Sequence, residues 1–306
     1  MTARYTPGHR EGKNKEREFT VDAPSPLLAY LLVTLSDKSR STVKSILASR
    51  QVAVNGTVTT RFDAPLQPGD RVRVNMEKGA TTLSLPEFEI VHEDDDLIVI
   101  NKPHGLLSVA TERERERTAY RALTDYARRT SPDGRVFVLH RLDRDTSGLM
   151  MFAKSERVQE IMQRGWDEMV TSRKYVAVVE GRPARDSDLV TSHLQENRAM
   201  NVYSSDEGKL AATRYTVLKT NGLYSLLELE LETGRKNQIR VHVADIGHPV
   251  AGDAKYGARS NPIRRLALHA RELHFIHPVT HREMHFRTDI PRRFSLLVKQ
   301  RDRTKK

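Results

Sequence analysis

The stretch VLHRLDRDTSG concentrates charged and hydroxyl side chains at the end of a short apolar run. Arg141 and Asp143 would share one face of a strand here, because alternate side chains of a strand point the same way. Asp145 opens a segment, Asp-Thr-Ser-Gly, that is typical of a turn held by side-chain to backbone hydrogen bonds. We therefore interpret Asp145 as structural and Asp143 as the candidate for chemistry. The alternative for Asp143 is a salt bridge that only ties two elements together.

A second polar cluster lies in TGRKNQIRVH, between an alternating strand and a predicted short helix. Arg235, Lys236 and Arg240 would surround the start of that helix, where free backbone amides also favour an anion. Thr233 or Asn237 could cap the helix. The cluster thus predicts an anion site, filled by a phosphate or by a carboxylate from elsewhere in the fold.

The composition favours a basic protein of two domains. The chain has 306 residues, a formal net charge of +11 and 38% hydrophobic residues, enough for a sizeable core. Such a charge favours a polyanionic partner, of which nucleic acid is the simplest. A soluble basic protein without such a partner is the alternative, which charge alone does not exclude.

The chain contains no cysteine, which excludes disulfides, cysteine metal sites and a thiolate nucleophile. A thiol-dependent uracil methyltransferase is therefore excluded. No apolar run approaches the roughly 18 residues of a membrane span. The polar first residues have no apolar core behind them, unlike a secretory signal. We expect a cytoplasmic protein with no membrane contact.

Residues 25–75 are predicted to form a small helix-helix-hairpin domain. Apolar residues follow a helical period twice, and an Asn-Gly pair then marks a hairpin. The segment SRSTVKSILASRQVAVNGTV resembles the small RNA-binding module named after the fourth small-subunit ribosomal protein. That resemblance implies that Arg40, Lys44 and Arg50 face RNA, whereas a solvated helix face is the alternative for these charges.

The following part, residues 87–295, is predicted to form one α+β domain on a mixed, mostly antiparallel sheet with a central cleft. Its apolar stretches alternate or end in turn residues, and few helical stretches separate them. The other segments are predicted to be a disordered basic tail (1–20), a linker (76–86) and a basic C-terminal tail (296–306).

Four blocks of this domain resemble the RluA-type pseudouridine synthases. In chain order they are EDDDLIVINKPHGLL, HRLDRDTSGLMMFAKS, TGRKNQIRVHVADIGHPVAGDAKYG and LALHARELHFIHPVT. The resemblance covers about residues 87–290, and four blocks in order are far more specific than a single motif. Several members of this family also carry a small RNA-binding module in front.

The resemblance implies an isomerisation: a uridine in RNA is detached at its glycosidic nitrogen, turned and rejoined through a ring carbon. The essential aspartate falls on Asp143, acting as a nucleophile or helping to abstract a sugar proton. Its partner falls on Arg240, whose positive charge would keep the carboxylate ionised. The active-site tyrosine falls on Tyr175, for which a strand aromatic in the core is the alternative.

The target base must leave its stack to reach such a site. Arg141 falls on the arginine that the family inserts where the base was. The segment SHLQENRAMNVYSSDEGKLAATRY resembles the family's basic hairpin, and Asn237 stands where the family commonly has histidine. The predicted substrate-binding residues are Arg141, Arg235, Lys236, Arg198 and Lys209.

Five histidines lie close together near the C-terminal end: His269, His274, His277, His281 and His285. The last three are four residues apart, as on one face of a helix, but Pro278 and the alternating pattern before it favour strand and turn. Only Glu272 and Glu283 lie among them as carboxylates, so we expect no zinc site. We expect no cofactor either, because the implied reaction neither oxidises nor hydrolyses.

Two functions of different classes remain open. A non-catalytic RNA-binding or ribosome-assembly factor fits the charge and the small domain equally well. Asp143 favours the enzyme, because plain RNA binding would disfavour a carboxylate by repulsion. The resemblance favours large-subunit ribosomal RNA over transfer RNA as the substrate, and we expect a monomer because no further apolar face remains.

Overall fold

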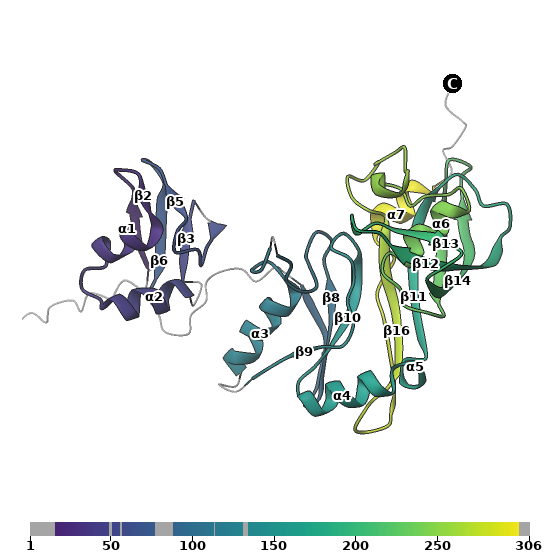
Figure 1. The fold of residues 1–306 in the computed structure, drawn as a ribbon, viewed down its shortest axis with the longest axis horizontal. Helices are drawn as coiled ribbons and strands as arrows, with labels where there is room; N and C mark the ends of the chain where they lie inside the picture. Colours follow the sequence, from purple (N-terminus) through teal and green to yellow (C-terminus); the bar gives the residue numbers. More distant parts are fainter. Residues whose placement is uncertain are drawn as a thin grey trace, which may run out of the picture. The chain divides into compact units, whose positions relative to one another are not determined.

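A computed structural model describes residues 16–48, 51–55, 57–76, 88–112, 114–130 and 134–299 of the protein (Figure 1). Its contacts divide the chain into two compact units, Met1–Leu85 and Pro86–Lys306. The predicted RNA-binding residue Arg50, most of the predicted linker and the outer parts of both predicted tails lie outside the described residues.

The first unit combines two helices with a four-stranded antiparallel sheet. The helices are α1 (Leu27–Thr34) and α2 (Arg40–Ala48). The sheet order is β1 (Glu16–Thr20), β6 (Arg71–Asn75), β3 (Val52–Val54) and β4 (Thr57–Val58), and β2 (Ser25–Pro26) pairs with β5 (Pro65–Leu66). Buried residues from both helices and the sheet form one core, including Leu27, Leu31, Leu35, Val43, Leu47, Val52, Val72 and Val74.

The inner end of the N-terminal segment is ordered, and the prediction of a disordered tail over residues 1–20 is wrong there. Glu16–Thr20 forms β1 and pairs with β6 along its whole length. Backbone hydrogen bonds hold this mostly polar strand, and Phe19 packs against the core of the unit. The first unit therefore begins several residues earlier than predicted.

The second unit is built on an 11-stranded sheet. Its strands are β7 (Glu89–Glu93), β8 (Leu97–Lys102), β9 (Phe137–Val138), β10 (Ser147–Ala153), β11 (Ser172–Glu180), β12 (Ser187–Glu196), β13 (Val202–Ser205), β14 (Lys209–Thr220), β15 (Tyr224–Leu231), β16 (Leu268–Ile276) and β17 (Glu283–Arg287). The main order is β13-β12-β14-β15-β11-β16-β10-β8-β7, with β17 paired to β16 and β9 to β10. Among the described strands, every pairing is antiparallel except that of β10 with β16. This confirms the predicted α+β class and the mostly antiparallel sheet.

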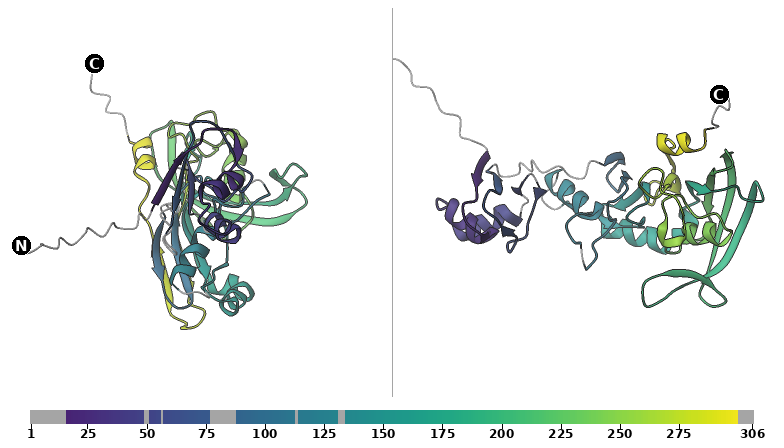
Figure 2. Two further views of the ribbon diagram at one scale, coloured as in Figure 1. Left: turned by 90° about the vertical axis from the view of Figure 1, so that its left-hand side faces the viewer. Right: turned by 90° about the horizontal axis from the view of Figure 1, so that it is seen from above.

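Helices cover the two halves of this sheet. They are α3 (Ala119–Thr130), α4 (Glu156–Arg164), α5 (Trp166–Met169), α6 (Gln238–Asp245) and α7 (Arg292–Leu297), with a 3-10 turn at Ala254–Tyr256. The first three pack on the half that contains β8 and β10, and the last two on the half that contains β11 and β15. Strands β12, β13 and β14 form an arm that extends beyond the rest of the unit (green in Figure 2).

The C-terminal helix belongs to the core, so the prediction of a basic tail from residue 296 is wrong at its start. Val298 is fully buried, and Leu297 packs against the same core cluster as α6. These two apolar side chains anchor the end of the described chain to the sheet.

Strand β16 lies between β10 and β11 and so joins the two halves of the sheet (Figure 1). Gly148 makes the contact possible: its φ is +116°, and a Cβ there would lie 2.1 Å from the backbone oxygen of Ala270. The backbones of β10 and β16 therefore meet closely just beyond the polar segment that carries Asp143. No helix in the described parts of the chain has the length and apolarity to cross a membrane.

Candidate active site

Asp143 lies on a loop between β9 and β10, not on a strand. The prediction that residues 135–143 (RVFVLHRLD) form one strand is correct only for Phe137–Val138, which pair with β10. Arg141 and Asp143 therefore do not share a strand face. They meet at the same cavity because the loop carries both to it.

The last residue of β8 and the segment after it hold this loop by hydrogen bonds to its backbone. The Ser108 hydroxyl donates to the Leu142 carbonyl (2.6 Å) and accepts from the Leu142 N–H (3.0 Å). The fully buried Lys102 ammonium donates to the Arg144 carbonyl at 3.2 Å, and the Gly105 N–H donates to the same oxygen at 2.8 Å. The backbone on both sides of Asp143 is thus fixed by the neighbouring segment.

Arg240, on α6, connects Asp143 to a second carboxylate. Its Nη1 donates to Asp143 Oδ2 at 3.2 Å, while its Nε and Nη2 donate to the two oxygens of Asp253 at 2.7 Å each. Burial opposes the charge on Arg240, but the two carboxylates outweigh it and raise the pKa of the guanidinium. Arg240 is therefore always charged. The Asp143 side chain keeps 30% of its surface exposed, so it is available to a ligand.

Asn237 helps to orient Arg240 instead of capping the helix. Its backbone is left-handed, with φ 55°, and its side chain makes no capping bond to α6. The Asn237 oxygen accepts from Arg240 Nη1 at 3.0 Å, and its amide donates to the Tyr256 hydroxyl at 3.0 Å. Tyr256 lies under the guanidinium, with its ring centre 4.8 Å from Cζ of Arg240. Asp253, Asn237 and Tyr256 thus hold the guanidinium that also donates to Asp143.

Tyr175, on β11, completes the wall opposite this pair. Burial raises the pKa of its phenol to about 12, an effect that Arg173 opposes and Asp143 reinforces. The phenol is therefore neutral at physiological pH and can donate or relay a proton. Tyr175 also packs against two core clusters, as the alternative of a strand aromatic in the core requires. Its role in catalysis stays a prediction.

One cavity of about 320 Å³ is lined by Asp143, Tyr175, Asn237 and Arg240. Its volume is within the range of about 300–1,000 Å³ that is usual for small-ligand sites. Of the predicted site residues, it brings together Asp143, Tyr175, Arg240, Arg141, Arg235 and Lys236. The Coulomb energy between Asp143 and Arg240 is on the order of 4 kcal/mol at an effective dielectric near 20, before desolvation is set against it. A pocket with one partly exposed carboxylate and a fixed cation suits covalent or acid–base chemistry on an uncharged ring.

The predicted RNA-contacting cations differ in how free they are. Arg141 is exposed and makes no hydrogen bond or ion pair among the described residues. Lys236 pairs with Glu196, and Arg235 donates from Nε to the Leu210 carbonyl at 3.1 Å. Of these three cations at the cavity, Arg141 is therefore the one most available to a ligand.

Four predicted RNA contacts are not among the residues that line this cavity. Arg198 and Lys209 are exposed on the arm formed by β12, β13 and β14, and neither lines the cavity. Arg40 and Lys44 are exposed on α2 in the first unit. Their contact with RNA stays a prediction.

Sequence reasoning did not single out Asp253, Ser108 or Gln238. The Gln238 side chain organises the loop before α6, because its Oε1 accepts from Thr233 Oγ1 (2.7 Å) and from the Arg235 N–H (2.9 Å). Asp253 and Gln238 both lie inside the block TGRKNQIRVHVADIGHPVAGDAKYG, which resembles the family. Their place in this block was the sequence signal that could have identified them as site residues.

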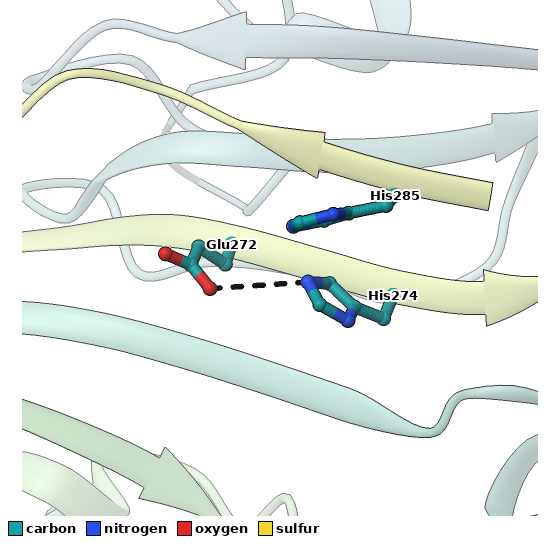
Figure 3. A group of neighbouring side chains, drawn as sticks. All are labelled: Glu272, His274 and His285. Atoms are coloured by element: carbon teal, nitrogen blue, oxygen red, sulfur yellow. Dashed lines mark ion pairs between the residues drawn. The ribbon is translucent and has the colours of Figure 1, made fainter.

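The histidines near the C-terminal end lie on strands and a turn, as predicted. Figure 3 shows Glu272 and His274 from β16 beside His285 from β17, with ligand atoms within 4.8 Å of one another. Arg287 donates to Oε1 of Glu272 at 2.9 Å, whereas Oε2 lies 3.8 Å from Nε2 of His274. This group could offer three ligands, but none of its members lines the cavity.

A second such group joins His277 to Asp94 and Asp96. The Nδ1 atom of His277 accepts from two backbone N–H groups of the following turn, and its Nε2 lies 3.2 Å from Asp94. The buried imidazole thus has partners on both nitrogens and serves the turn.

Comparison with known proteins supports one assignment. The family model for RNA pseudouridylate synthase matches residues 96–245. An uncharacterised RNA pseudouridine synthase of Mycoplasma pneumoniae is 34% identical over 92% of this chain and 94% of its own. Ribosomal large subunit pseudouridine synthase D of Escherichia coli K12 is 33% identical over 83% of this chain and 84% of its own.

A solved structure agrees with these relatives. The human RNA pseudouridylate synthase domain containing 4 protein matches 67% of this chain and 90% of its own, with a TM-score of 0.56 and 25% identity. The chain therefore belongs to the RluA-type RNA pseudouridine synthases, enzymes that isomerise uridine in RNA to pseudouridine.

Proposed function

We propose that Asp143 is the catalytic carboxylate of this isomerisation and that the substrate uridines lie in large-subunit ribosomal RNA. The observation that carries the proposal is the pair of Asp143 with a fixed Arg240, 3.2 Å apart, in a cavity also lined by Tyr175. The carboxylate keeps an exposed oxygen for the substrate, while the arginine stabilises its charge.

The reaction breaks the bond from C1′ of the ribose to N1 of uracil and forms a bond from C1′ to C5. Asp143 either attacks the sugar carbon or abstracts a sugar proton, and the geometry allows both. The proton on C5 then leaves to solvent, and N1 of uracil takes up a proton in its place. The neutral phenol of Tyr175 lies on the cavity wall and can relay such a proton. Arg141, free at the mouth, fills the gap in the RNA stack once the base has been extruded.

The choice of ribosomal RNA rests on the relatives, several of which are named for the large ribosomal subunit. It also agrees with the net charge of +11 and with exposed cations such as Arg40 and Lys44 in the first unit. We further propose that the enzyme acts as a monomer, in the cytoplasm, as the sequence leads us to expect.

The test is the substitution Asp143→Asn, with Asp145→Asn as a matched control on the same loop. Tritium release from RNA labelled at uracil C5 measures turnover, and filter binding measures RNA affinity. Asp143→Asn should abolish release and leave binding largely intact, whereas Asp145→Asn should retain activity, because the ion pair of Asp145 is with the exposed Arg144.

Turnover that persists in the Asp143→Asn protein would overturn the catalytic assignment. Release from transfer RNA but not from large-subunit RNA would overturn the substrate assignment alone. Binding without release from either RNA by the unaltered protein would favour a non-catalytic RNA-binding factor.

A further inference from the structure

A second cavity, of about 440 Å³, adjoins the one that contains Asp143. The two share part of their lining, namely Arg141, Tyr175, Leu231, Gly234 and Arg235. A ligand that fills the first cavity would therefore have the second directly beside it. Beyond the shared wall, this second cavity reaches Trp166 and Arg173.

Arg173 presents a flat cation over the Trp166 ring. Arg173 and Tyr175 alternate on β11 and so face the same side of the sheet. The guanidinium carbon lies 5.9 Å from the indole centre, and the geometry is that of a cation–π contact. Among the described residues it has no hydrogen bond or ion pair, so its N–H donors are available to a ligand.

Gly234 is needed for this position of Arg173. A Cβ on Gly234 would lie 2.5 Å from Arg173 Nη1. The guanidinium therefore rests against the backbone of the loop that carries Arg235. This contact places Arg173 between the indole and the shared wall.

His140 completes a set of planar groups around Trp166. Its ring centre is 5.5 Å from that of Trp166, and its Nε2 accepts from the Met151 N–H at 3.0 Å. Burial lowers the pKa of the imidazole to about 3, and Arg173 acts in the same direction. The ring is therefore neutral, and the positive charge of the platform comes from Arg173.

We propose that this second cavity binds the base of the nucleotide next to the target uridine, stacked on the Trp166–Arg173 layer. The inference rests on the proposed function, because it takes RNA as the ligand of the neighbouring cavity. Aromatic and guanidinium planes are the usual platforms for single-stranded bases. The lining carries three arginines against one carboxylate, Asp167, which suits a phosphate-bearing ligand.

The experiment combines enzyme and RNA variants. The substrate is a large-subunit RNA fragment that the unaltered enzyme modifies, and two further copies carry an abasic site immediately 5′ or 3′ of the target uridine. Tritium release under single-turnover conditions gives the half-saturating concentration and the maximal rate for the unaltered enzyme and for Trp166→Ala, Trp166→Phe and Arg173→Met.

We expect Trp166→Ala and Arg173→Met to raise the half-saturating concentration on intact RNA by about 5- to 150-fold, the range that alanine substitution gives for one stacked base. Trp166→Phe should restore most of the affinity. One of the two abasic RNAs should bind the unaltered enzyme as weakly as intact RNA binds Trp166→Ala. Trp166→Ala and Arg173→Met should not weaken the binding of that abasic RNA any further.

An equal effect of the variants on intact and abasic RNA would overturn the proposal, because Trp166 would then act without the neighbouring base. No effect of either abasic site on the unaltered enzyme would overturn it as well. Trp166 packs against a core cluster, so if Trp166→Ala does not fold, Arg173→Met and the abasic RNAs decide the question. An unaltered enzyme that modifies no large-subunit fragment would instead defeat the proposed function.

Discussion

The two carboxylates around Arg240 predict a specific effect of Asp253→Asn. Asp253 is only 2% exposed and accepts both short bonds from Arg240, whereas Asp143 accepts a single longer one. Asparagine has nearly the same size as aspartate but carries no charge. One of the two oxygens that accept from the guanidinium is replaced by an NH₂ group, which can only donate. Arg240 then keeps one good bond to residue 253 and is free to shift.

Two estimates give the size of the effect. A unit charge pair about 4 Å apart interacts by roughly 4 kcal/mol at an effective dielectric near 20. Breaking a buried ion pair by altering one partner typically costs about 3–5 kcal/mol. We therefore expect the free energy of unfolding to fall by about 3–5 kcal/mol. A shift of Arg240 by about 1 Å should also slow the reaction on the order of 100-fold.

Urea unfolding measures the decrease in stability, and single-turnover tritium release, corrected for the folded fraction, measures the rate. The matched control is Asp186→Asn, which breaks the ion pair between Asp186 and Arg182. The two side chains are 73% and 56% exposed, respectively. That change should cost no more than about 1 kcal/mol. If Asp253→Asn is destabilised as little as the control and reacts at the unaltered rate, Asp253 does not position Arg240 and the reasoning fails.

Two further predictions concern acid stability and RNA binding. Burial lowers the pKa of the His269 imidazole to about 4, and Arg265 acts in the same direction. Between pH 6.5 and 4 the unfolded chain therefore binds up to one more proton at this residue than the folded chain. The free energy of unfolding thus decreases by up to about 1.4 kcal/mol for each unit by which the pH is lowered. His269→Gln should remove this part of the slope in urea unfolding at pH 7, 6 and 5; an unchanged slope would show that His269 titrates alike in both states. In the first unit, Arg40→Gln with Lys44→Gln should reduce the slope of log affinity against log salt by about 0.7–0.9 for each phosphate that the protein no longer neutralises, and an unchanged slope would mean that α2 does not touch RNA.

Elements with strong local signals could be predicted from the sequence. The Asn221-Gly222 pair marks the turn between β14 and β15, and Gly222 has the positive φ, 87°, that such a turn requires. The residues of α6 follow a helical period and end before Gly247. In both cases neighbours in sequence supply the stabilising contacts, so the pattern is complete within a short window.

Elements that depend on distant partners could not be predicted in the same way. The segment around Leu142 resembles a strand, but Ser108 and Lys102 satisfy its backbone as a loop. Strand β1 has few apolar side chains and is recognisable only through its pairing with β6. The role of Asp253 requires knowing that a loop after α6 returns to Arg240. Each of these contacts is set by tertiary structure and leaves no periodic trace.

The position of β16 has a consequence for how the enzyme is made on the ribosome. Strands β10 and β11 are translated well before β16, yet each pairs with β16 in the finished sheet. Until residue 268 has emerged, the nascent chain carries two half-sheets with open edges that are prone to pairing with other chains. Asp143 belongs to the first half and Arg240 to the second, so a message that stops before Arg240 yields a protein in which the two side chains never meet.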